Sequence, residues 1–96
     1  MDDPYLDLID EQWNNIAMMY DVFRDKQPIV EYDVDNKKIY TYLANDYIGG
    51  LTARTRNETK KQYEEACKNN QFMLFIKDKR NKKFRSYIFD VPEQRL

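Results

Sequence analysis

The sequence predicts an α+β domain: a four-stranded antiparallel sheet with two helices on one face, a two-layer sandwich in the order αββαββ. One long segment has apolar residues at helical spacing, and a second begins with a helix-capping pattern. Four shorter segments are rich in branched and aromatic residues and form two pairs. The 96 residues, 42% of them hydrophobic, suit one core, so we expect a single domain over residues 1–96.

The first helix is predicted from Pro4 to about Arg24 or Asp25. Asp3 can accept hydrogen bonds from free backbone amides, and proline suits the first helical position. Apolar residues then recur at steps of three and four, namely Leu6, Ile9, Trp13, Ile16, Tyr20 and Phe23. Pro28 ends the helix.

The first hairpin is predicted from residues 29–34 and 38–43, joined by a turn at residues 35–37. Alternation places Glu31, Asp33 and Asp35 on one side of the first strand. We expect an exposed edge strand that these acids keep soluble. Residues 45–50 are predicted to form a turn or one helical turn, because Gly49 and Gly50 end it.

The second helix is predicted to begin at Thr55, because Thr55 and Glu58 have the spacing of a capping box. Its apolar face is thin, with Tyr63, Ala66 and Cys67 as its main members, so we expect it to dock on something larger. Cys67 is expected to pack as a small buried residue.

The last hairpin is predicted from residues 72–77 and 84–91. Both faces of its first strand are largely apolar, which indicates a central strand.

Composition argues against most catalytic chemistry. The chain has no histidine, which excludes nucleophile–histidine pairs and histidine-based zinc sites, and its one cysteine cannot build a thiolate zinc site. We therefore expect a protein that is not an enzyme and that uses no cofactor or metal. An enzyme with carboxylate or lysine chemistry in a cleft remains an alternative. A further alternative is a modest anion site beside Gly49 and Gly50, although the spacing of these glycines matches no nucleotide-binding motif.

The expected location is the cytoplasm. The start of the chain is acidic where a signal peptide would be basic, and a single cysteine cannot form an internal disulfide. No apolar stretch approaches the roughly 20 residues that a bilayer span needs.

Charge is unevenly distributed along the chain. Residues 1–48 hold 11 acids and 4 bases, whereas residues 49–96 hold 6 acids and 12 bases. The halves could form two ends of a dipolar domain that steers onto an oppositely charged protein or onto another copy of itself.

The predicted function is protein binding, as an adaptor, inhibitor or regulatory subunit and possibly as a homodimer. The predicted surface joins the basic last hairpin to the start of the second helix: Arg54, Arg56, Lys77, Lys79, Arg80, Lys82, Lys83, Phe84, Arg85 and Tyr87. Exposed tyrosines such as Tyr40, Tyr42 or Tyr47 could add contacts. Nucleic-acid binding by the same surface is the alternative, because bases neutralise phosphates and aromatic rings can stack on unpaired bases.

Overall fold

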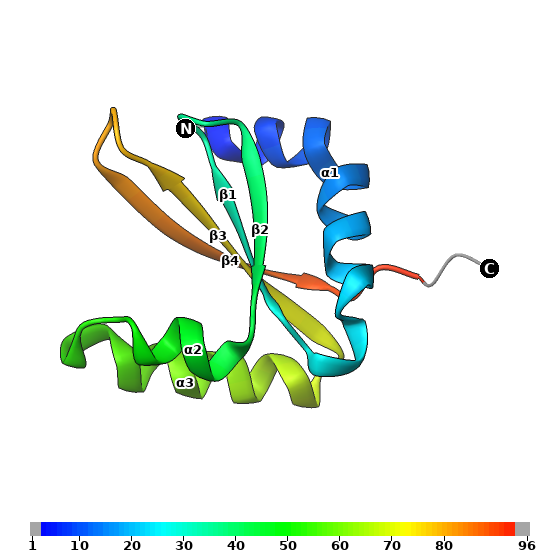
Figure 1. Cartoon of the computed structure of the whole chain (residues 1–96), viewed down its shortest axis with the longest axis vertical. Helices are drawn as coiled ribbons and strands as arrows, with labels where there is room; N and C mark the ends of the chain where they lie inside the picture. The colour runs from blue at the N-terminus through cyan, green and yellow to red at the C-terminus, as the bar shows by residue number, and fades with distance from the viewer. Residues whose placement is uncertain (1–2, 94–96) are drawn as a thin grey trace.

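Two helix–hairpin units follow one another along the chain (Figure 1). The computed structural model describes residues 3–93. The elements are α1 Pro4–Val22, the 3-10 turn η1 Arg24–Lys26, β1 Ile29–Asp33, β2 Lys38–Tyr42, α2 Ala44–Gly49, α3 Ala53–Lys68, β3 Gln71–Asp78 and β4 Lys83–Asp90. The predicted α+β class and four-stranded sheet are confirmed. Among the described residues, no helix has the length and apolar character that a membrane span requires.

Helix α1 begins where its sequence predicts. The Asp3 carboxylate accepts a hydrogen bond of 2.9 Å from the Tyr5 amide, and Pro4 occupies the first turn. Helix α3 instead begins earlier than predicted, because its N-cap is Thr52 and not Thr55. Thr52 is the residue before its first turn, and the Thr55 hydroxyl lies 3.1 Å from the Thr52 hydroxyl. The prediction of a Thr55 start was therefore wrong.

The sheet is mixed, which corrects the predicted antiparallel sheet. Its strand order is β2-β1-β3-β4, and β1 runs parallel to β3. The chain between the two hairpins contains α2 and α3, and such a crossover is long enough to join parallel strands. Strand β1 is therefore central, and Glu31 and Asp33 are buried rather than exposed on an edge.

Helices cover both faces of the sheet, so the predicted two-layer arrangement is wrong as well (Figure 1). One core joins α1 to the sheet through Tyr5, Ile9, Ile16, Tyr20, Val30, Tyr32, Phe72, Leu74 and Ile76. A second core joins α2 to alternate residues of the same strands through Ile29, Ala44, Ile48, Met73 and Phe75, with Tyr63 of α3 packed against it. Successive strand residues point to opposite faces. Since β1 and β3 bury side chains on both sides, each face needs its own cover.

The two hairpin turns share one local structure. At each turn an aspartate accepts hydrogen bonds from the side chain and backbone of an asparagine three residues later: Asp33 from Asn36, and Asp78 from Asn81. These bonds lower the pKa of Asp33. The pKa of Asp78 is lowered first by the Tyr5 hydroxyl, 2.6 Å away, and then by Asn81.

Candidate interaction groove

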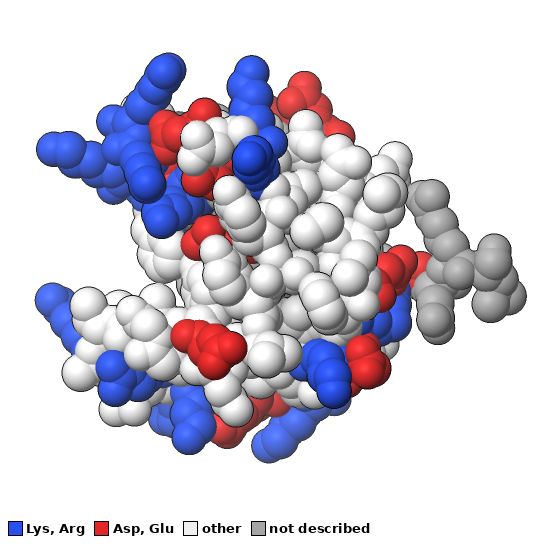
Figure 2. Space-filling model, in the orientation of Figure 1, with Lys and Arg blue, Asp and Glu red and all other residues white. Residues whose placement is uncertain are grey.

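The two predicted basic segments flank one groove. It has a volume of about 490 Å³ and is lined by Glu31, Tyr42, Asp46, Tyr47, Gly50, Leu51, Lys77 and Phe84; we call it the basic groove. Figure 2 shows the surface hollowed at the left. Lysines and arginines gather above the hollow over the β3–β4 turn, and further ones lie below it toward the α2–α3 connection. Crossover topology therefore brings together two segments that are distant in the sequence.

The β3–β4 hairpin forms one side of the groove. Lys77 and Phe84 face each other across the two strands, and both line the groove. The other bases of this side lie on the exposed turn or next to it: Lys79, Arg80, Lys82 and Lys83. Asp35 of the neighbouring turn offsets part of this charge, because it accepts a 2.7 Å hydrogen bond from the Lys79 amide and lies 4.0 Å from Arg80. The Arg80 side chain is nevertheless 91% exposed and open to a partner.

The other side of the groove is the start of α3. The Arg56 guanidinium donates a 3.0 Å hydrogen bond to the Leu51 carbonyl, and Leu51 lies in the groove. Arg54 is exposed on the same first turn. Arg56 therefore stands next to the groove. Arg54, two residues earlier on the helix, points about 200° away from Arg56 around the helix axis.

A row of aromatic rings crosses the sheet beneath the groove. Ring centroids are 6.4 Å apart for Tyr40 and Tyr42, 5.1 Å for Tyr42 and Tyr47, 4.8 Å for Tyr47 and Phe75, and 5.3 Å for Phe75 and Phe84. The middle of the row is covered by α2, but Phe84 at its end is 51% exposed. The floor thus offers both a rigid apolar surface and an accessible ring.

Two carboxylates also belong to the groove. Glu31 is only 7% exposed and accepts a 2.9 Å hydrogen bond from the Tyr47 hydroxyl. Burial raises the pKa of Tyr47, and the nearby Glu31 raises it further, so this hydroxyl stays a hydrogen-bond donor. Asp46 contributes a second carboxylate. The groove is therefore basic at its sides and partly acidic at its centre.

Two residues of the predicted surface lie elsewhere. Arg85 and Tyr87 point to the α1 face, where the Tyr87 hydroxyl bonds Asp3 at 2.6 Å and Arg85 approaches it to 3.4 Å. The Tyr87 bond is the largest cause that lowers the pKa of Asp3. The acidic start of α1 therefore lies against the strand that follows the basic turn.

Three members of the groove were not predicted from the sequence, namely Leu51, Glu31 and Asp46. Leu51 follows two glycines and carries no motif, so nothing in the sequence singled it out. Glu31 was assigned to an exposed edge because its place in a central strand depends on the crossover. Within residues 3–93, no three side chains of metal-ligating types are grouped so as to hold an ion.

Comparisons with known proteins give no family for this chain. No match was found among protein-family models, curated proteins or solved structures. Its function is therefore argued from the groove itself.

Proposed function

We propose that the protein is a small non-catalytic binding module that holds an acidic segment of a partner protein in the basic groove. One observation carries the proposal: two basic segments, from the last hairpin and from the start of α3, flank a single groove with an aromatic floor. A charged rim around exposed aromatic area is common in recognition surfaces.

The exposure of the groove residues indicates which part of the partner each would contact. Acidic side chains of the partner would meet the exposed bases of the turn, where each pair contributes up to about 1 kcal/mol and speeds association. An apolar side chain between them would cover the exposed half of Phe84 and the neighbouring Leu51. Burial of half a phenylalanine contributes about 1 kcal/mol.

Single-stranded nucleic acid is the second candidate, favoured by the aromatic row beside the basic turn. The carboxylates of Glu31 and Asp46 oppose it. A nucleic acid carries a phosphate at every nucleotide, so some of its phosphates would lie beside these carboxylates and be repelled. A peptide can instead place its acids at the two sides and apolar residues in the middle, which is why we rank protein binding first.

The test is selection from a displayed library of random peptides, with labelled single-stranded and duplex oligonucleotides titrated in parallel over a salt series. One variant reverses four bases of the turn, Lys79, Arg80, Lys82 and Lys83, to glutamate. A matched control reverses four exposed lysines elsewhere, Lys26, Lys60, Lys61 and Lys68.

We expect selected peptides with acidic residues on both sides of an apolar centre, whose binding is lost in the turn variant and kept in the control. Oligonucleotide binding that weakens steeply with salt would support the alternative instead. Peptides without acidic bias, or equal binding to both variants, would contradict the proposal.

A further inference from the structure

Strand β4 has an uncovered face and an open edge. It is the outer strand of the sheet and pairs only with β3, in a register that runs without interruption from Lys83 to Asp90. Phe84 is 51% exposed and Ile88 is 41% exposed, although both are large apolar residues in a strand. Long, regular edge strands with apolar side chains are sites of strand pairing.

The free backbone groups of this edge can be assigned to particular residues. Just beyond β4, the Val91 amide donates a 3.0 Å hydrogen bond to the Asn70 carbonyl, on the β3 side. Along an antiparallel strand, residues that bond to the neighbouring strand alternate with residues whose N–H and C=O groups point away from it. Since Val91 bonds to the β3 side, the backbone groups of Phe84, Ser86 and Ile88 point to the open edge. Their side chains lie on the α3 face, because Ser86 is opposite Phe75 of the second core.

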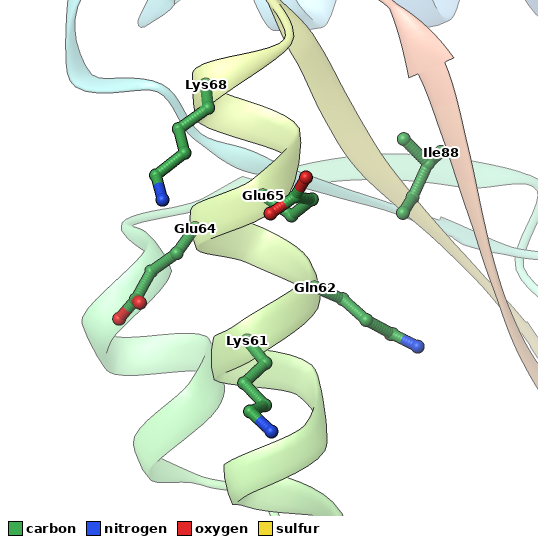
Figure 3. Close-up of a pocket in the computed structure, with 6 residues that line it drawn as sticks. All are labelled: Lys61, Gln62, Glu64, Glu65, Lys68 and Ile88. Carbon is green, nitrogen blue, oxygen red and sulfur yellow. The ribbon is translucent and has the colours of Figure 1, made fainter.

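A groove between α3 and β4 leaves the same face open. It has a volume of about 390 Å³, and Ile88 is its only lining residue from the sheet. Figure 3 shows Gln62 and Glu65 extending from α3 toward the side of the groove where Ile88 lies, while Lys68 and Glu64 point away. Helix α3 therefore does not cover the outer strand.

We propose that a second copy of this chain pairs with β4 in antiparallel orientation, with the two Ser86 residues opposite each other on a two-fold axis. This register places Phe84 of each copy opposite Ile88 of the other, on one face of the joined sheet. Directly opposed side chains in such a pair lie about 5 Å apart and stabilise each other. A shift of the register by one pair toward the end of the strand would set Phe84 against Asp90 and lose the apolar pair.

The charges at the two ends of β4 are opposite in sign, so they become neighbours when two copies pair in antiparallel orientation. Lys83 begins the strand, Lys82 precedes it in the turn, and Asp90 ends the strand. Antiparallel pairing about Ser86 brings the turn of one copy, which carries Lys82, next to Asp90 of the other, and symmetry repeats this contact. The small Ser86 side chain at the axis lets the four apolar side chains meet. Strand length, apolar pairs and end charges thus all favour a second copy as the occupant.

This interface shares Phe84 with the basic groove but is otherwise formed by other residues of β4. Phe84 lies at the border of both surfaces, so variants of Ser86, Ile88 and Asp90, none of which lines the basic groove, separate the two proposals.

The test is analytical ultracentrifugation of the full chain over a concentration series up to about 1 mM. We expect a monomer–dimer equilibrium. Ile88→Lys should weaken the dimer at least about tenfold, because symmetry removes each contact twice. Ser86→Pro should do the same, because it removes an amide that points to the open edge and takes no part in the β3 ladder. Ser86→Ala is the matched control and should dimerise as the wild type does.

Circular dichroism checks that each variant is folded, and a charge exchange supplies a readout that misfolding cannot imitate. Asp90→Lys should weaken the dimer, and adding Lys82→Asp to the same chain should restore it. A wild type that stays monomeric over the whole series overturns the proposal. A dimer that survives both Ile88→Lys and Ser86→Pro also overturns it, because the interface would then lie elsewhere.

Discussion

The hydrogen bond between Tyr47 and Glu31 provides a sensitive test of how the groove is built. The Glu31 carboxylate lies in the central strand β1 and is almost fully buried, and the structure gives its side chain one hydrogen bond, from the Tyr47 hydroxyl of α2. The substitution Tyr47→Phe removes that hydroxyl and keeps the ring packed between Tyr42 and Phe75. The carboxylate then stays buried without its donor.

An unsatisfied buried polar group costs about 1 to 3 kcal/mol, and more when it is charged. We therefore expect Tyr47→Phe to lower the free energy of unfolding by about 2 kcal/mol. With a urea dependence of about 1 to 1.5 kcal/mol per molar, the midpoint should fall by about 1 to 2 M. Combining Tyr47→Phe with Glu31→Met removes both partners and should recover most of the loss.

Urea unfolding followed by circular dichroism compares the wild type, Tyr47→Phe, Glu31→Met and the double variant as a double-mutant cycle. Tyr63→Phe is the matched control, because the Tyr63 hydroxyl donates to the Gln27 carbonyl at an exposed site where water can replace it. We expect a loss below about 1 kcal/mol for the control. A Tyr47→Phe loss as small as that of the control, or a double variant that is no more stable than Tyr47→Phe, would refute this account of Glu31.

Two further predictions concern the hairpin turns. Lys82 has a φ of 52°, which strains any residue with a Cβ. Lys82→Gly should therefore raise the free energy of unfolding, measured in urea, by about 0.5 to 1 kcal/mol, whereas Lys83→Gly should lower it. A loss of stability in both variants would contradict the turn geometry. The lowered pKa values of Asp33 and Asp78 mean that their contribution to stability is present above their ordinary value near 3.8 and is lost as the pH falls below it. The urea midpoint should accordingly drop on acidification below pH 4, and it should drop less in Asp33→Asn than in the wild type. An identical pH dependence in that variant would show that the Asp33 carboxylate does not contribute to the pH dependence of stability.

Local chemistry explains what could be predicted from the sequence. The start of α1 follows from a carboxylate followed by a proline, and each hairpin follows from short apolar runs around a polar turn. The basic turn of the last hairpin is visible in the same way, since Lys79 to Lys83 are neighbours in the chain. Alternation could also have separated Phe84 from Arg85, because adjacent strand residues point to opposite faces.

The remainder depends on contacts between distant segments. Nothing near Glu31 shows that β3 will lie beside β1, so its acid pattern resembled a solvated edge, and only the fold supplies Tyr47 as its partner. The parallel pairing likewise follows from how α2 and α3 cross the sheet. For the same reason the sequence indicated both basic segments but not Leu51 and the groove that they share.

The central claim is that one ligand contacts both sides of the basic groove at once. Two-dimensional amide NMR of the labelled chain, titrated with an acidic peptide from the library selection, measures this most directly. We expect shifts in two separate stretches, residues 50–56 and 77–84, that saturate at the same peptide concentration. Shifts confined to one stretch, or centred on the α1 face around Tyr87, would contradict the account.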